Sequence, residues 1–221
     1  MKSIRACLFD MDGVIVDTAK FHFLAWQRLA ESLSISFGEA ENEQLKGVSR
    51  VDSLEMILRW GGLTLNNEKK LELMDLKNRW YLEYAEAVSP SDLLPGVLHL
   101  LQALKSAQVK IGLGSSSKNA IMILDRLGIH SYFDVIIDGN KTHLSKPHPE
   151  VFERGARELQ LSPDEIVVFE DASSGVAAAK AGGFACIGIG DQKVLSAADA
   201  VVSGLDGMTL ERMQTLLIGH Q

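Results

Sequence analysis

Short runs of apolar residues alternate along the chain with longer stretches whose apolar residues recur three and four positions apart. The short runs are bounded by Gly, Ser or Asp, which is typical of strands buried in a parallel sheet. The longer stretches have the spacing of amphipathic helices. This alternation predicts an α/β fold with a doubly wound, parallel, Rossmann-like sheet. Six strands are predicted, at Ile4–Phe9, Val109–Leu113, Val135–Ile137, Ile166–Phe169, Ala185–Ile189 and Ala200–Val202.

One region interrupts this alternation, because residues 17–92 show helical patterns and no strand. Three helices are expected there. The first has Thr18 as its N-cap, the second spans about residues 51–60 and ends at Gly61-Gly62, and the third runs from about residue 67 to 88. We therefore expect an all-helical cap domain of residues 17–92, inserted into a core domain of residues 1–16 plus 93–221. The expected hinges are residues 16–18 and 90–95.

Composition and charge narrow the class of protein. The 221 residues are 46% hydrophobic and 23% charged, as in ordinary soluble domains. The net charge of −7 argues against nucleic acid or an anionic membrane as a partner, and no apolar run reaches the ~18 residues of a membrane span. Cys7 and Cys186 lie singly in apolar runs and are predicted to be reduced core residues. We expect a cytoplasmic monomer that acts on a small molecule.

Two aspartates directly follow the first predicted strand. Asp10 and Asp12 lie in Leu8-Phe9-Asp10-Met11-Asp12-Gly13, where the strand period of two directs both side chains to the same side. One carboxylate can attack phosphorus, which forms an aspartyl phosphate, while the other handles protons. The alternative is a strand-capping Asp followed by a turn Asp before Gly13.

A second acidic pair follows the strand at 166–169. Asp171 can join Asp10 in binding a hard cation, because carboxylate oxygens suit Mg²⁺. Glu170 can hold a water molecule that is bound to this ion. Asp17 adds a further carboxylate five residues after Asp12. The alternative for Glu170-Asp171 is a cap on the helix that begins near Ser173.

A phosphate-binding loop is predicted after the strand at 109–113. Ser115-Ser116-Ser117-Lys118-Asn119 combines hydroxyls, backbone N–H groups and the start of a helix. Lys146, which Pro147 holds in an extended conformation, can add a point charge for the transferring phosphate. A serine-rich loop with an ordinary N-cap, and a surface lysine before proline, are the alternatives.

Together these residues resemble the four motifs of the haloacid dehalogenase superfamily: Asp10-Met11-Asp12-Gly13, Ser115, Lys146-Pro147 and Glu170-Asp171. Within it, the helical insertion resembles that of the β-phosphoglucomutase family. The matching segments are Asp17-Thr18-Ala19 with His22 and Trp26, Leu45-Lys46-Gly47-Val48-Ser49-Arg50 with Ser53, Lys77-Asn78, Ser89-Pro90 and Ser117-Lys118-Asn119. The superfamily motifs alone specify only the superfamily, whereas the Leu45–Arg50 string points to the mutases.

The resemblance implies interconversion of β-glucose 1-phosphate and glucose 6-phosphate through enzyme-bound β-glucose 1,6-bisphosphate. It implies that Asp10 is the phosphorylated nucleophile and Asp12 the general acid/base. It also implies that Asp10, the main-chain carbonyl of Asp12 and Asp171 bind Mg²⁺ with support from Glu170. The residues expected to contact phosphate or substrate are Ser115, Lys146, Arg50, Ser117, Lys118, Asn119, Gly47, Val48, Ser49, Ser53, Trp26, His22 and Lys77.

Arg50 is the residue of this set that lies on the insertion and has a physical rationale of its own. Its guanidinium can hold a phosphate in bidentate fashion, so binding the distal phosphate would draw cap and core together and exclude water. His22 and Lys77 resemble the cap-domain pair that couples substrate binding to the placement of Asp12. A solvated Arg50, a structural His22 and a core-packing Trp26 are the alternatives.

Two other functions remain open on the sequence. A Mg²⁺-dependent sugar-phosphate phosphatase of the same superfamily needs the core residues, but it has less reason to keep Arg50 and Lys77. A non-catalytic binder of sugar phosphate or metal would not need both Asp10 and Asp12.

Overall fold

A six-stranded parallel sheet, in the order β3-β2-β1-β4-β5-β6, forms the centre of the molecule in the computed structural model, which describes residues 3–218. Its strands are β1 (Ala6–Phe9), β2 (Lys110–Gly114), β3 (Val135–Ile137), β4 (Ile166–Glu170), β5 (Ala185–Ile189) and β6 (Ala200–Val202). Every neighbouring pair is parallel. The predicted doubly wound α/β fold is confirmed, and the six predicted strands differ from the observed ones only at their ends.

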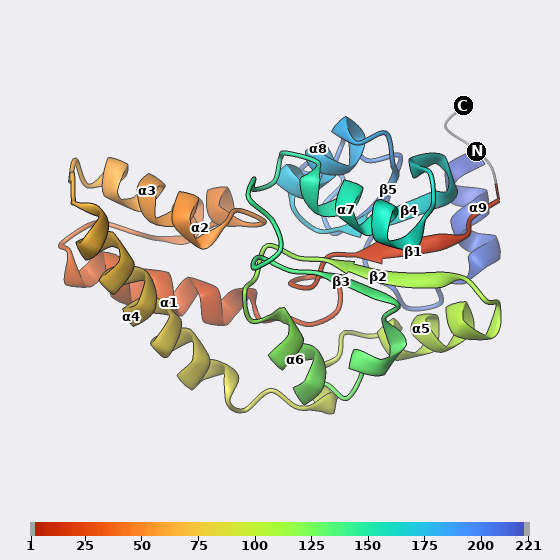
Figure 1. Ribbon diagram of the computed structural model, residues 1–221, viewed down its shortest axis with the longest axis horizontal. Helices are drawn as coiled ribbons and strands as arrows, with labels where there is room; N and C mark the ends of the chain where they lie inside the picture. Colours follow the sequence, from red (N-terminus) through yellow and green to blue (C-terminus); the bar gives the residue numbers. More distant parts are fainter. Residues whose placement is uncertain (1–2, 219–221) are drawn as a thin grey trace.

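Helices cover both faces of this sheet, as Figure 1 shows. Alternate side chains of the central strands point to opposite faces, so β1, β4 and β5 each contribute to two separate hydrophobic clusters. One face packs against α5 (Val97–Ser106), α6 (Ala120–Arg126) and α9 (Leu210–Ile218), and the other against α7 (Glu150–Leu159) and α8 (Ser173–Ala181). Phe9 and Phe169 stack at 4.8 Å on the first face. This packing fixes the ends of β1 and β4, which carry the acidic residues.

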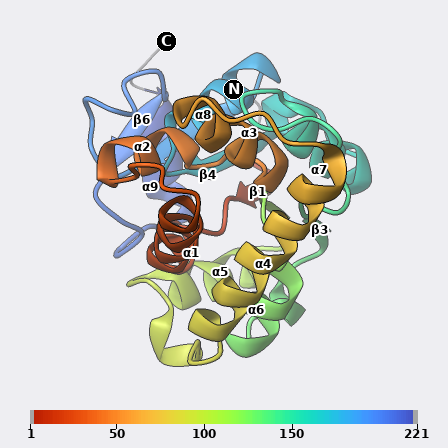
Figure 2. The same ribbon diagram turned by 90° about the vertical axis from the view of Figure 1, so that its left-hand side faces the viewer.

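Four helices lie together beyond one edge of the sheet (Figures 1 and 2). They are α1 (Ala19–Ser32), α2 (Glu39–Leu45), α3 (Arg50–Trp60) and α4 (Asn67–Ala85). They enclose a hydrophobic cluster of their own, whose buried members include Trp26, Leu29, Leu54, Ile57 and Leu73. The all-helical cap is therefore present, and its division from the core at residues 17 and 92 stays a prediction.

The helical predictions for this cap need three corrections. Helix α2 was not predicted, because its seven residues, Glu-Ala-Glu-Asn-Glu-Gln-Leu, show no apolar period. Helix α4 ends at Ala85 and not at residue 88. Thr18 stands before α1 but makes no side-chain cap bond, because its hydroxyl donates to the Asp12 carboxylate.

The remaining short elements are the 3₁₀ turns η1 (Pro90–Asp92), η2 (His130–Tyr132) and η3 (Pro163–Glu165). Among residues 3–218, no helix combines the length and the apolar character that crossing a bilayer requires.

Candidate active site

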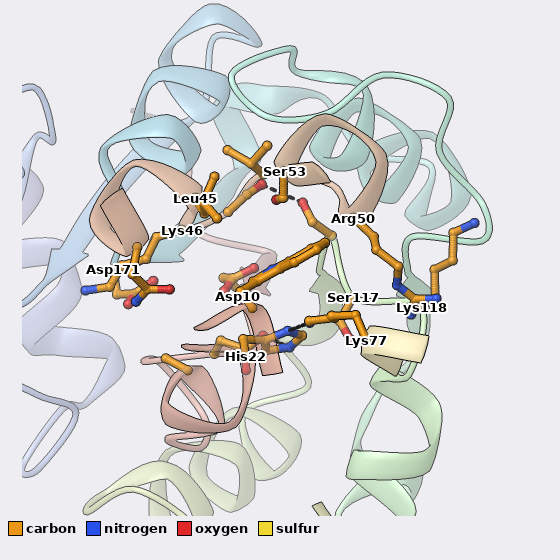
Figure 3. Close-up of a pocket in the computed structure, with 17 residues that line it drawn as sticks. Asp10, His22, Leu45, Lys46, Arg50, Ser53, Lys77, Ser117, Lys118 and Asp171 are labelled. Atoms are coloured by element: carbon orange, nitrogen blue, oxygen red, sulfur yellow. Dashed lines mark hydrogen bonds and ion pairs between the residues drawn. The ribbon is translucent and has the colours of Figure 1, made fainter. Parts of the chain in front are cut away.

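The predicted chemistry-bearing residues meet at the carboxyl ends of β1, β2 and β4, where open parallel sheets bind ligands. Asp10 follows β1, Ser115 follows β2 and Asp171 follows β4. The backbone N–H of Asp10 donates to the Phe169 carbonyl at 2.9 Å, which joins the two acidic strand ends. The cap covers this edge of the sheet, so a pocket forms between the two (Figure 3).

Lys146 is the cation at the centre of the site. Its ammonium is fully buried and lies 2.6 Å from Asp10 Oδ1 and 2.5 Å from Glu170 Oε1. Burial opposes a charge there, but the carboxylates of Asp10 and Glu170 outweigh it and raise the pKa of Lys146. The ion pair holds the Asp10 carboxylate in place at the end of β1. This burial excludes the alternative that Lys146 is a surface lysine. The peptide bond between Lys146 and Pro147 is cis.

Three carboxylates lie close enough to share one cation. Asp10, Glu170 and Asp171 each offer an oxygen, and these oxygens lie within 4.8 Å of one another. Glu170 already accepts hydrogen bonds from Lys146 and, at 2.9 Å, from the Ala172 N–H. Asp10 and Asp171 are therefore the better direct ligands, with Glu170 in support.

The electrostatics of Asp171 favour a bound cation. Burial and the neighbouring carboxylates of Glu170 and Asp10 raise its pKa well above the usual range. Such crowded negative charge is costly without a counter-ion. Gly13 leaves room for this carboxylate, because a Cβ at its position, where φ is +75°, would stand 2.0 Å from Asp171 Oδ2. Asp17, by contrast, is exposed and does not line the pocket, so its predicted place in the site is wrong.

Asp12 lies on the cap side of Asp10, in contact with Thr18 and near His22. Its carboxylate accepts a hydrogen bond from Thr18, and its Oδ2 lies 3.9 Å from His22 Nε2. Burial and the Asp10 charge raise the pKa of Asp12 to about 7. A carboxyl with this pKa suits proton transfer near neutral pH. Its side chain is not among the three grouped carboxylates, which leaves its main-chain carbonyl as the predicted metal contact.

His22 of α1, which is half-buried, and Lys77 of α4, which is buried, form the predicted cap-domain pair (Figure 3). Lys77 Nζ lies 2.8 Å from His22 Nδ1 and 4.6 Å from the centre of the Trp26 ring. Burial lowers the pKa of both side chains well below their usual values. The pair places polar nitrogen atoms between the cap helices and Asp12. Because the pKa of each side chain is lowered, the pair needs to carry little positive charge there. Trp26 both lines the pocket and packs in the cap cluster.

Arg50 enters the pocket from the cap and Lys118 from the core, on the side away from Asp171 (Figure 3). Arg50 Nη2 donates to Asn78 Oδ1 at 2.8 Å, and Asn119 Nδ2 donates to the same oxygen at 2.9 Å. In the serine loop, the N–H groups of Ser117 and Asn119 donate to the hydroxyls of Ser115 and Ser117. These two N–H groups stabilise the loop and are not free to bind phosphate. Phosphate would therefore be bound by the other donors of the loop.

Cap and core are joined by hydrogen bonds around the pocket. Ser116 Oγ donates to the Gly47 carbonyl at 2.7 Å, Ser174 Oγ donates to the Lys46 carbonyl at 2.8 Å, and Ser145 contacts Asp52. The loop between α2 and α3 is therefore held against the core, and the structure shows a cap closed over the strand ends.

Most of the predicted residues line the pocket: Asp10, Asp12, His22, Trp26, Gly47, Val48, Arg50, Ser53, Lys77, Ser117, Lys118 and Asp171. Ser115, Asn119, Lys146 and Glu170 are not among the residues that line it. Ser49 is instead the N-cap of α3, where its hydroxyl accepts from the Asp52 N–H at 3.2 Å. Ser116 lines the pocket from the predicted phosphate-binding loop, and Ala19, Asn42, Leu45 and Lys46 also line it although no role was predicted for them. No sequence pattern indicated Asn42, because it lies in helix α2, which was not predicted.

Comparisons with known proteins show the family of the chain. Residues 4–183 match the haloacid dehalogenase-like hydrolase family. The chain is 44% identical to a β-phosphoglucomutase of Bacillus subtilis over 210 residues, which cover 94% of this chain and 93% of that protein. The chain belongs to the haloacid dehalogenase-like family, among its β-phosphoglucomutases.

Two further relatives mark the range of this family. The crystal structure of a β-phosphoglucomutase from Clostridium difficile superimposes with a TM-score of 0.95 at 38% identity, covering 98% of each chain. A phosphorylated carbohydrates phosphatase of Thermotoga maritima is 34% identical over 208 residues, or 90% of this chain and 93% of that protein.

Proposed function

We propose that the protein is a β-phosphoglucomutase that interconverts β-glucose 1-phosphate and glucose 6-phosphate. The observation that carries this function is the placement of two phosphate-binding regions in one closed pocket. Asp10 lies at the sheet end of the pocket with Lys146 behind it, while Arg50 and Lys118 enter from the other side. A sugar bisphosphate has one phosphate for each region.

The chemistry follows from the two aspartates. Asp10 attacks phosphorus while the bond from phosphorus to the departing sugar oxygen breaks, and the proton on Asp12 passes to that oxygen. In the return step, Asp12 takes the proton from the accepting sugar hydroxyl, whose oxygen then displaces Asp10 from phosphorus. The pKa of about 7 lets Asp12 both give and take this proton near neutral pH. Lys146 balances negative charge on the transferring oxygens.

We infer that Mg²⁺ binds between Asp10 and Asp171, with the Asp12 carbonyl as a further ligand and Glu170 in support. The donor set is all oxygen, which suits Mg²⁺, and the raised pKa of Asp171 indicates a carboxylate in need of a cation. When bound, the ion would offset negative charge between the carboxylates and the phosphoryl oxygens.

Cap closure supports mutase chemistry over hydrolysis. Water would hydrolyse an aspartyl phosphate, so a mutase gains from a pocket that excludes it. Three cap-to-core contacts, through Gly47, Lys46 and Asp52, hold the α2–α3 loop and the start of α3, where Arg50 lies, against the core. The T. maritima phosphatase keeps hydrolysis as the second candidate. The finer predictions of a monomer and of a cytoplasmic location remain part of this proposal.

Product balance separates the two functions. The purified protein is given β-glucose 1-phosphate, Mg²⁺ and a trace of the bisphosphate, and both glucose 6-phosphate and free phosphate are measured. We expect glucose 6-phosphate without matching release of free phosphate. Release of free phosphate that matches the loss of substrate would establish the phosphatase instead. Absence of both products would favour a non-catalytic binder.

A further inference from the structure

Asn78 connects the two sides of the pocket without lining it. Its side-chain oxygen accepts one hydrogen bond from Arg50 Nη2 at 2.8 Å and another from Asn119 Nδ2 at 2.9 Å. Arg50 begins α3, Asn78 lies in α4, and Asn119 ends the serine loop of the core. One oxygen atom therefore ties two cap helices and the core loop to a common point.

The partner of Arg50 at this point is neutral. A carboxylate there would orient the guanidinium equally well, but it would also cancel most of the charge that an anion needs. An amide oxygen orients the guanidinium and leaves its full positive charge. Burial lowers the pKa of Arg50, and the nearby carboxylate of Asp75 opposes that shift. The guanidinium therefore stays positively charged where it faces the pocket.

The second hydrogen bond to Asn78 adds a dependence on closure. Asn119 belongs to the core and reaches Asn78 only when the cap lies against it. The same core loop carries Lys118, which lines the pocket beside Arg50. Asn78 thus sets the direction of Arg50 and the separation of Arg50 from the core loop at the same time.

We propose that Asn78 is a positioning residue that pre-orients Arg50, without neutralising it, for the phosphate of the hexose phosphate farthest from Asp10. This inference rests on the proposed function, since that function supplies the distal phosphate. It predicts that changes at Asn78 act through Arg50 and spare the chemistry at Asp10.

The test uses Asn78→Ala and Asn78→Asp in the full-length protein, assayed for mutase turnover and for Asp10 phosphorylation by acetyl phosphate. The wild-type protein is assayed first, so a wild type without mutase activity counts against the proposed function and not against Asn78. In that case glucose 6-phosphate binding by calorimetry replaces turnover as the readout. Loss of a hydrogen bond to a charged group predicts that Asn78→Ala raises KM, or the dissociation constant, about tenfold. Phosphorylation by acetyl phosphate, which has no distal group, should change less than about twofold.

Asn78→Asp keeps the acceptor and nearly the same shape, so it reports on charge in a folded protein even if the alanine variant is unstable. We expect it to weaken hexose phosphate binding at least as much as Asn78→Ala does, because the new carboxylate competes with phosphate for Arg50. Arg79→Ala, at the next and exposed position of α4, is the matched control and should leave KM within about twofold of the wild-type value.

A double-mutant cycle gives the decisive comparison. In an Arg50→Ala background, Asn78→Ala should add little further loss, because it acts through the missing guanidinium. Three results would overturn the inference: a full additional loss in that background, an Asn78→Asp variant that binds hexose phosphate as the wild type does, or an equal loss of acetyl phosphate reactivity in Asn78→Ala.

Discussion

The side chains of the site owe their reactivity to burial as much as to their identity. Lys146, Asp10 and Glu170 form a buried cluster of one cation and two anions, next to an Asp171 whose pKa is raised by burial and by its neighbours. Burial and the Asp10 charge raise the pKa of Asp12 to about 7, which supports its proposed acid/base function. The shifts at Lys146 and Asp171 both depend on Asp10, which lies far from them in the chain.

At this scale we predict that Asp10→Asn abolishes turnover. The amide is too weak a nucleophile to form an acyl phosphate as a carboxylate does, so activity should fall by at least about a thousandfold. Asp17→Asn is the matched control, because Asp17 is exposed and should keep nearly full activity. Steady-state assays of both variants give the comparison. An Asp10→Asn enzyme of near-normal activity would remove Asp10 from the nucleophile role.

The elements show why the sequence predicts the core better than the cap. Buried strands such as Ile166–Phe169 are continuous apolar runs, and acidic residues directly after them are recognisable because parallel strands end at one edge. Helix α2 has no such signal, since its polar residues are placed by the neighbouring helices and not by an apolar period. The Asn78 contacts were equally hidden, because no local pattern shows that residues 50, 78 and 119 meet.

The turn after β1 offers a test at the scale of an element. In Gly13→Ala, the added methyl carbon would stand 2.0 Å from Asp171 Oδ2, so the two atoms would clash. The substitution also strains a backbone with φ of +75°. We expect Mg²⁺ affinity, measured by titration calorimetry, to fall at least about tenfold as Asp171 is displaced.

Gly62→Ala separates the clash from the strain. Gly62 also has a positive φ, of +64°, but a Cβ there meets nothing within 4 Å. It should lower stability by about 1 kcal/mol and leave Mg²⁺ affinity unchanged. Equal loss of Mg²⁺ affinity in both variants would mean that strain, and not contact with Asp171, is responsible.

Across the whole molecule, the cap brings the cationic side chain of Arg50 to a site built on the core. We predict that Arg50→Ala raises the KM for hexose phosphates about tenfold or more, while Asp10 phosphorylation by acetyl phosphate changes less than about twofold. Arg59→Ala, in the last turn of the same helix and exposed, is the control. An equal loss with both phosphoryl donors would show that Arg50 acts on the core site itself and not through the distal phosphate.

The excess of negative charge in the site predicts a pH-dependent affinity for Mg²⁺. The pKa of Asp171 is raised well above its usual range, so the free protein holds a proton there that a cation must displace. The affinity should therefore increase as pH rises, and proton release on binding should decrease. Calorimetric titration at about pH 6 and about pH 8, in buffers of different ionisation enthalpy, measures both. Equal affinity at the two values would contradict the raised pKa.

The location of the phosphoryl group during turnover tests the catalytic account most directly. The enzyme is mixed with acetyl phosphate and Mg²⁺, quenched rapidly in acid, digested and sequenced by mass spectrometry. We expect the added phosphoryl group on Asp10, in the peptide that follows β1, and its loss when β-glucose 1-phosphate is added before the quench. A phosphoryl group on any other side chain would contradict the account.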